Sequence, residues 1–192
     1  MSANNGELVA ASPNCHVLMR DLAHEVDAGR LTDLEAACKV AEYIHKALNC
    51  VHVTFWSVSG RVGERVMRSV AAYDGVKGVA TAGTAAFPES DGGFLGAIAR
   101  DGCYVCSDTF ADPALSGVKE TMLVPYNIRA LLSASYGGQG DVWGIVTCTN
   151  VVQRQWRSSE VTLLRKCAAE ISTLRAHRRS LGNSLSTGGF LK

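Results

Sequence analysis

The chain has 192 residues, with 19 Lys and Arg against 18 Asp and Glu, and therefore a formal net charge of +1. Hydrophobic residues make up 47% and charged residues 19%, the balance of one globular domain with a sizeable core. This charge balance gives no general attraction to nucleic acid or to an anionic membrane surface. No apolar run approaches a membrane span, and the first residues lack the pattern of a signal peptide, so we expect a cytoplasmic protein.

The cysteines are the most unusual part of the composition. Their number is odd, and most of them stand in apolar patterns, which favours small buried core residues in a reducing compartment over a disulfide framework. The seven are Cys15, Cys38, Cys50, Cys103, Cys106, Cys148 and Cys167.

A helix is predicted near the N-terminus, after a short polar segment. We expect residues 1–11 to be disordered and residues 12–30 to form a helix that begins at Ser12 and Pro13 and ends at Gly29. Apolar residues recur every four positions along it and form a thin stripe, typical of a helix that packs on a partner surface. The stripe consists of Leu18, Leu22 and Val26.

A second helix is predicted from a capping box, in which Thr32 and Glu35 satisfy each other's free backbone donors. Its apolar residues keep a spacing of three and four, which places them on one face, and Asn49 is a plausible left-handed terminator. These residues are Leu34, Ala37, Ala41, Ile44 and Leu48.

Extended structure follows this helix. Alternation of apolar and polar residues over 51–56 predicts a strand, and residues 65–73 are its expected hairpin partner. Residues 75–93 are rich in Gly, Ala and Thr, which predicts a long loop with one short strand near 76–80.

Short elements alternate in the middle of the chain. The pattern predicts a short helix that begins near Phe94 and ends at Asp101 and Gly102, a short strand over 103–107, an irregular stretch over 108–117 and a short helix over 119–124.

The last third contains the clearest strand pair. Residues 128–136 and 142–150 flank a Gly-rich turn and predict a hairpin, and a helix should run from Ser158 or Ser159 to about His177. We expect residues 180–192 to be a disordered tail. This order of elements predicts an α+β fold, with a central antiparallel sheet of about six strands flanked by N- and C-terminal helices.

Several segments resemble the GAF domain family, small sensory modules of signalling proteins. The resemblance covers about residues 32–175, specifies the fold and implies a GAF-like domain over 31–179; Ser135 departs from it, since the family has a Pro there. The segments that carry it are GGFLGAIARDGCYVCSDTFADPAL (92–115), NIRALLSASY (127–136), DVWGIVTCTN (141–150) and RQWRSSEVTLLRKCAAEIS (154–172).

The Cys103-x-x-Cys106 spacing could belong to a redox pair or to half of a zinc site. On a strand, however, residues an odd number apart point to opposite faces, and neither a second such pair nor a nearby His is present. We therefore interpret the two as one buried and one outer thiol. The scattered histidines form no metal motif, and no nucleophile-elbow, Walker A or zinc-protease pattern exists.

The family's known activities map poorly onto this chain. The free methionine sulfoxide reductases use cysteines at positions that correspond to Leu95 and residues 115–118, where no Cys stands. Bilin-binding members attach the chromophore through a Cys beside a His, and residues 114–130 contain neither. The residue set of the cyclic-nucleotide-binding members is absent as well.

The resemblance therefore implies a noncatalytic sensor whose small-molecule pocket lies between the sheet and the loops that cross it; the residues identify neither ligand nor cofactor. A rearranged reductase using Cys103, Cys106 or Cys148, and a dimerisation module with a collapsed pocket, are the alternatives. For each aromatic or Leu, core packing is the competing interpretation. The candidate ligand-binding residues are Phe55, Phe94, Asp108, Leu115, Leu123, Tyr126, Leu132 and Thr147.

A homodimer is the expected assembly. The stripe of the first helix and a heptad stripe on the last helix leave apolar surface that a second copy could cover. The last helix contributes Val161, Leu164, Ala168 and Ile171. A downstream signalling protein or output domain is the expected further partner.

Overall fold

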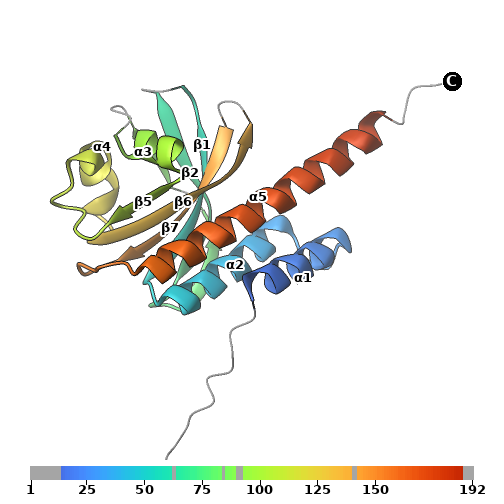
Figure 1. Cartoon of the computed structure of the whole chain (residues 1–192), viewed down its shortest axis with the longest axis horizontal. Helices are drawn as coiled ribbons and strands as arrows, with labels where there is room; N and C mark the ends of the chain where they lie inside the picture. The colour runs from blue at the N-terminus through green and yellow to red at the C-terminus, as the bar shows by residue number, and fades with distance from the viewer. Residues whose placement is uncertain (1–13, 62–63, 84, 90–92, 140–141, 188–192) are drawn as a thin grey trace, which may run out of the picture.

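The computed structural model describes residues 14–61, 64–83, 85–89, 93–139 and 142–187, and it has an α+β architecture (Figure 1). In chain order the elements are α1 (Cys15–Asp27), α2 (Asp33–Leu48), β1 (His52–Ser59), β2 (Arg65–Asp74), β3 (Val79–Ala82), β4 (Ala86–Glu89), α3 (Gly93–Asp101), β5 (Cys103–Cys106), the 3-10 turn η1 (Pro113–Leu115), α4 (Ser116–Val118), the π-helical turn η2 (Lys119–Leu123), β6 (Ala130–Gln139), β7 (Val142–Asn150) and α5 (Ser158–Thr187).

One antiparallel sheet organises the molecule. Its strand order is β3-β2-β1-β7-β6-β5, and β4 pairs with the other half of β2. Helices α1, α2 and α5 cover one face, whereas α3, α4 and the adjoining turns lie on the other (Figure 1). The predicted fold class is therefore confirmed.

The pleat of the sheet divides the core in two. The helix-side core lies beneath α1, α2 and α5, and the loop-side core lies beneath α3, α4 and η2. The helix-side core includes Met19, Leu22, Ile44, Leu48, Val53, Phe55, Leu132, Tyr136, Val146, Cys148, Leu164 and Cys167. The loop-side core includes Trp56, Met67, Phe87, Phe94, Leu95, Ile98, Cys106, Leu115, Met122, Leu123, Leu131 and Ile145.

Helix α1 begins three residues later than the sequence predicts. The Asn14 side chain caps the helix by accepting a 3.1 Å hydrogen bond from the His16 amide. The predicted start at Ser12 and Pro13, like the segment 1–11, lies outside the described residues. Gly29 ends this region at φ +70°, as expected for a left-handed terminator.

Helix α2 has the predicted capping box and the predicted terminator. The Thr32 amide donates to the Glu35 carboxylate at 2.8 Å, the Glu35 amide donates back to Thr32 Oγ1 at 3.2 Å, and Asn49 has φ 47°. Leu34, expected on the buried face, is instead 38% exposed. The first turns of α2 border an open pocket, which Asp33 helps to line. The apolar face of α2 is therefore fully covered only in the later turns of the helix.

The segment 75–93 holds two short strands rather than one. Strands β3 and β4 pair with the two halves of β2, so they extend the sheet at its edge. All four residues of β3 are exposed, so no buried face imposes the apolar alternation by which strands are recognised.

Helix α5 is longer than predicted and buries its predicted interface. It continues to Thr187 instead of ending near His177, so it overlaps the tail predicted to be disordered from residue 180; residues 188–192 lie outside the described residues. Leu164 and Ala168 are 0% and 2% exposed in the helix-side core. Of the other stripe residues Leu22 is in that core, and Leu18, Val26, Val161 and Ile171 are only partly exposed.

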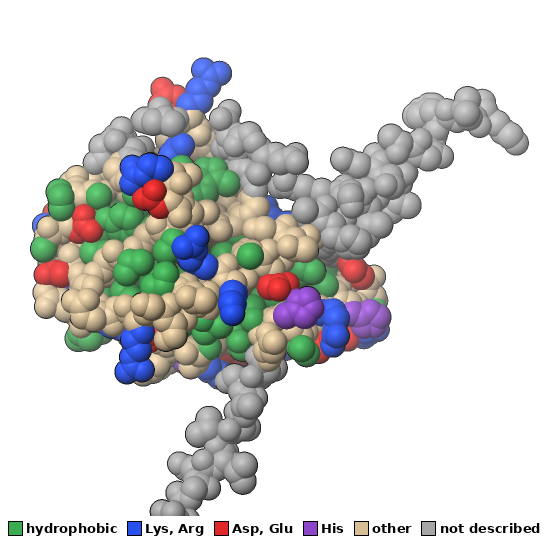
Figure 2. Space-filling model, in the orientation of Figure 1, with side chains coloured by type: hydrophobic (Ala, Val, Ile, Leu, Met, Phe, Trp, Pro, Cys, Tyr) green, Lys and Arg blue, Asp and Glu red, His purple; other side chains and the backbone are tan. Residues whose placement is uncertain are grey.

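Charges of both signs are spread over the surface. Figure 2 shows Lys and Arg interspersed with Asp and Glu on the visible face, consistent with the balanced composition. None of the helices in the described ranges has the length and apolar character that crossing a membrane requires.

A substitution at Gly144 of β7 tests how closely the helix-side core is packed. A Cβ atom at this position would lie 2.3 Å from Cε2 of the buried Tyr136 ring. Gly144→Ala should therefore force the ring to shift and lower the free energy of unfolding by about 1–3 kcal/mol, measured by urea denaturation.

The matched control for this substitution is Gly96→Ala in helix α3, where an added Cβ has nothing within 4 Å. Alanine is the better helix former, so this variant should be as stable as the parent or more stable by up to about 1 kcal/mol. Equal stability of the two variants would contradict the packing described for Tyr136.

Candidate functional site

A pocket of about 430 Å³ lies between the loop-side face of the sheet and the segment that follows η2. Its volume is within the range of small-molecule sites. The lining residues are His52, Thr54, Trp56, Ser69, Ala72, Tyr73, Asp74, Lys77, Thr81, Ala82, Gly83, Ala85, Phe87, Met122, Tyr126, Ile128, Leu131, Thr147 and Thr149. We call it the loop-side pocket.

Hydroxyl groups of the two central strands form the floor of this pocket. The pleat directs Thr54 and Trp56 of β1 and Thr147 and Thr149 of β7 to the same face. Trp56 Nε1 donates a 2.7 Å hydrogen bond to Thr147 Oγ1, which in turn donates to the Thr54 carbonyl at 3.3 Å. The indole is thereby held in a fixed orientation against the floor.

Three aromatic rings form one wall. Trp56 and Phe87 meet edge to face with ring centroids 5.7 Å apart, and Phe87 and Tyr126 do so at 6.2 Å. The first two rings are buried, whereas Tyr126 is 55% exposed. The wall therefore extends from the buried floor to a solvent-exposed ring.

The pocket also has a charged end. His52 Nε2 and Lys77 Nζ lie 3.7 and 3.6 Å from the Asp74 carboxylate. Burial lowers the pKa of His52, and the Asp74 charge opposes that effect only in part. Burial acts to raise the pKa of Asp74, but amide hydrogen bonds from Lys77 and Val76 and the His52 charge outweigh it, so this pKa is lowered.

The structure brings together two of the eight predicted ligand-binding residues. Tyr126 and Thr147 both line the loop-side pocket. Phe94, Leu115 and Leu123 are fully buried in the loop-side core and outside its lining, where they support the structure. For these three, the competing interpretation of core packing fits the structure.

Phe55 and Leu132 face the other side of the sheet. Both belong to the helix-side core, because their strand positions differ by one from residues of the pocket floor. Phe55 lines a different pocket, described below.

Asp108 lies outside both pockets and makes local contacts. Its carboxylate accepts hydrogen bonds from Arg129 at 3.2 Å, Gln153 at 2.5 Å and the Phe110 amide at 3.2 Å. The Arg129 guanidinium also lies 4.5 Å from the Phe110 ring centroid. Asp108 thus organises the loop after β5.

Sequence reasoning missed Trp56, Phe87 and the His52–Asp74 pair. The alternation over 51–56 already placed His52, Thr54 and Trp56 on one face, so this signal could have found two of these residues. Phe87 depends on how β4 pairs with β2, and Asp74 on the register that places it opposite His52 in β1, and no local pattern reports either pairing.

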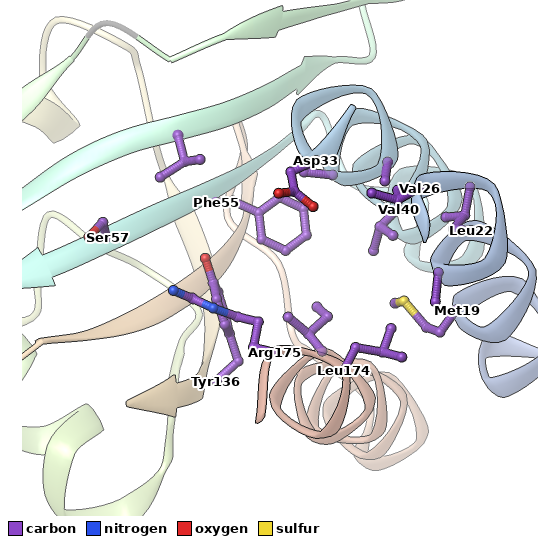
Figure 3. A pocket seen from close by; sticks show the side chains of 15 residues that line it. Met19, Leu22, Val26, Asp33, Val40, Phe55, Ser57, Tyr136, Leu174 and Arg175 are labelled. Carbon is purple, nitrogen blue, oxygen red and sulfur yellow. The ribbon is translucent and has the colours of Figure 1, made fainter. Parts of the chain in front are cut away.

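A second pocket, of about 590 Å³, opens among the three helices on the opposite face of the sheet. In Figure 3 its side chains surround an open space: Met19, Leu22 and Val26 come from α1, Val40 from α2, Phe55 from β1 and Leu174 from α5. Tyr136 lines it too and donates a 3.2 Å hydrogen bond to the Trp56 carbonyl, while the Arg175 guanidinium lies 5.3 Å from its ring centroid. We call this the helix-side pocket.

The cysteines considered for a rearranged reductase are separated by the sheet. Cys103 packs against the helix-side core, whereas Cys106 belongs to the loop-side core. Burial, with Asp112 nearby, raises the pKa of Cys106 to about 12, and burial raises that of Cys148 strongly as well. None of the three lines either pocket.

Comparison with known proteins identifies a family and several structural neighbours. A family model described as GAF domain matches residues 34–174. No curated protein matches the chain by sequence. The phycocyanobilin-bound GAF domain from a cyanobacterial phytochrome superimposes with a TM-score of 0.67 at 11% identity, over 87% of this chain and 96% of that one.

Two further structural neighbours are a light-absorbing GAF domain and an enzyme. The blue-light-absorbing form of the Thermosynechococcus elongatus PixJ GAF domain has a TM-score of 0.65 at 17% identity, covering 88% of this chain and 94% of that one. The free methionine-R-sulfoxide reductase of Neisseria meningitidis, in complex with its substrate, has a TM-score of 0.58 at 16% identity, covering 94% and 99%. At these identities the likeness establishes the fold alone.

The lowered pKa of His52 predicts a pH effect on stability. The unfolded chain takes up a proton near pH 6.5 that the folded pocket resists, so the contribution of neutral His52 is complete above this pH and is lost as the pH falls below it. In urea denaturation from pH 7.5 down to pH 5, His52→Gln should show a shallower decline in the free energy of unfolding than the parent. Identical slopes in the two proteins would contradict the burial of His52.

Proposed function

Because the chain belongs to the GAF domain family, we propose that it is a sensory domain that binds a small molecule in the loop-side pocket. The observation that carries this proposal is the combination, in one cavity of about 430 Å³, of a hydroxyl-lined floor and an aromatic wall. Pockets of this kind bind ligands by burying apolar surface while a few polar groups fix the orientation.

The lining favours a planar aromatic or heterocyclic ligand. Trp56 and Phe87 offer ring surfaces for stacking or edge contacts. The hydroxyls of Thr54, Ser69 and Thr149 can donate or accept hydrogen bonds with polar groups on the ligand's rim. A ligand of this chemistry would satisfy both surfaces at once.

The charged end adds a second requirement. His52, Asp74 and Lys77 offer an acceptor and donors within one corner of the pocket. A ligand that carries a polar substituent at one end would place it there. The GAF domain neighbour with a bound phycocyanobilin is a member whose ligand is a pigment. In this chain no cysteine is among the residues that line the loop-side pocket, so we propose noncovalent binding.

Signalling is proposed to pass through helix α5. This helix packs on β6 through Leu164 and Ala168 and then projects away from the sheet (Figure 1). Because the two stripes predicted from the sequence are largely used inside the protomer, we propose that a homodimer forms instead through the projecting half of α5. A downstream protein or output domain would respond to the arrangement of the paired helices.

The competing function is that of the reductase neighbour, which acts on free methionine sulfoxide. The thiols of Cys103, Cys106 and Cys148 lie outside the pocket, and burial raises the pKa of each, which disfavours the thiolate needed for nucleophilic attack. This placement favours the sensory proposal.

Ligand binding is tested by a thermal-shift screen of aromatic and heterocyclic metabolites, followed by titration of each hit with Trp fluorescence. Thr147→Val removes the hydroxyl that holds the Trp56 indole, and Tyr126→Ala removes the outer ring of the wall. Each should weaken binding of the hit by roughly fivefold, since a lost hydrogen bond or ring contact is worth about 1 kcal/mol.

Asp108→Ala is the matched control, because the Asp108 carboxylate lies outside the pocket. This variant should bind the hit with the same affinity as the parent. Unchanged affinity in the Thr147 and Tyr126 variants would contradict the placement of the site. Turnover of free methionine sulfoxide with a thioredoxin reductant, by the same preparation, would overturn the sensory proposal in favour of the reductase.

The assembly is tested by sedimentation of the full chain and of a chain that ends at Arg175. The full chain should sediment as a dimer at micromolar concentration, and the shortened chain should sediment as a monomer. The shortened chain should also retain the circular dichroism signal of the β-sheet, which shows that it is folded. A full chain that remains monomeric at high micromolar concentration would rule out the α5 interface.

A further inference from the structure

Two cysteines from opposite ends of the chain meet where α1 packs on α5. Cys15 Sγ and Cys167 Sγ lie 2.9 Å apart, although 152 positions separate them in the sequence. Two unbonded sulfur atoms in ordinary van der Waals contact lie further apart than this. Both side chains belong to the helix-side core, where Cys15 is 6% exposed and Cys167 is fully buried.

The contact between the helices also rests on other groups. His16 Nδ1 lies 3.1 Å from both carboxylate oxygens of Glu170, one position along from Cys15 and three from Cys167. Met19 and Leu22, one and two turns further along α1, are buried in the same core. The two helices are therefore held together by a hydrogen bond and by core packing immediately C-terminal to the sulfur pair.

The two thiols differ in character. Cys15 is the first residue of α1, where the free amides and the helix dipole favour a thiolate. The hydrogen bond with Cys167 lowers the pKa of Cys15 against the opposing effects of burial and of Glu170, and it raises the pKa of Cys167. Cys15 is thus the nucleophile of the pair and Cys167 its proton-bearing partner.

Two further thiols, Cys50 and Cys148, belong to the same core as the pair. Burial is the main cause of the raised pKa of Cys148 in β7, and Cys50 and Cys167 both lie close enough to raise it further. Tyr43 of α2 is also close enough to Cys15 and Cys167 for the two thiols to raise its pKa, together with burial, which is the larger cause. Across the described ranges, no three His, Cys, Asp or Glu side chains are arranged to hold a metal ion. A metal-binding role for these thiols is therefore not supported.

We propose that Cys15 and Cys167 form a redox-active dithiol, which hydrogen peroxide converts to a disulfide between α1 and α5. The Cys15 thiolate attacks one peroxide oxygen, the O–O bond breaks, and with one proton water leaves and a sulfenic acid remains. Cys167 then attacks the sulfenyl sulfur and loses its proton, and the hydroxyl leaves as a second water. Two thiols are oxidised by two electrons, and the peroxide is reduced to two waters.

The disulfide would act on the layer of helices that carries the helix-side pocket. Helix α1 forms one wall of this pocket through Met19 and Leu22, and α5 forms the adjoining wall through Ile171 and Leu174 (Figure 3). In the reduced protein only noncovalent contacts hold the two walls together. In the oxidised protein a covalent bond at one end fixes their separation.

The test is peptide mapping of the reduced, desalted full chain after titration with hydrogen peroxide, with free thiols blocked by N-ethylmaleimide. Trypsin releases Cys15 in residues 1–20 and Cys167 in residues 167–175, and each peptide contains a single cysteine. We expect these two peptides to appear joined, and to separate again after dithiothreitol treatment. The oxidised protein should also unfold at a higher temperature, because the bridge restricts the unfolded chain.

Cys15→Ser and Cys167→Ser should each abolish the joined peptides and the thermal shift. The matched control is Cys38→Ser, because Cys38 is the half-buried thiol of α2 and should leave both signals intact. Irreversible oxidation or alkylation of Cys15 and Cys167 without the joined peptides, in the wild-type chain with its circular dichroism unchanged, would overturn the proposal. Joined peptides that pair either residue with Cys148 or Cys50 instead would overturn it too.

Discussion

The pleat of β1 is the constraint on which the rest of the structure depends. This strand is paired on both sides, by β2 and by β7, so its side chains have only the two faces of the sheet to occupy. Val53 and Phe55 are committed to the helices, and Thr54 and Trp56 to the loops. A shift of one residue in the pairing of β1 would turn Val53 and Phe55 toward the loops and Thr54 and Trp56 toward the helices. One register therefore specifies both cores and both pockets.

The same strand connects the two pockets physically. Phe55 lines the helix-side pocket, and the adjacent Trp56 lines the loop-side pocket. The Tyr136 hydroxyl, on the helix side, donates to the carbonyl of Trp56, whose indole is held by Thr147 on the loop side. A displacement of the indole by a bound molecule would therefore act on a hydrogen bond that reaches the helix layer. These few contacts give the two pockets, on opposite faces of the sheet, a short physical route by which one could influence the other.

Local chemistry accounts for what the sequence predicted correctly. The capping box of Thr32 and Glu35, the left-handed Asn49 and the alternation in β1 depend on neighbours within a few residues, and each was recognised with its location. In the following segment only one short strand was predicted, near 76–80, and β4 was missed, since both edge strands are short and take their shape from β2. Six of the eight candidate ligand-binding residues lie outside the loop-side pocket for a related reason. Leu115 and Asp108 have suitable side chains, but only the path of the chain decides whether such groups face a cavity, a core or a neighbouring loop.

The length of α5 has a mechanical consequence. The helix is anchored as far as Ser172, which accepts a hydrogen bond from the Gly137 amide, and Leu174, which packs against the helix-side core, whereas the backbone from Ala176 to Thr187 extends for roughly 17 Å at about 1.5 Å per residue. A rigid rod of that length acts as a lever: a tilt of about 10° at the anchored end moves the far end by about 3 Å, given the same helical rise. A rearrangement too small to break any packing contact in the core becomes, at the end of α5, a displacement comparable to the width of a side chain.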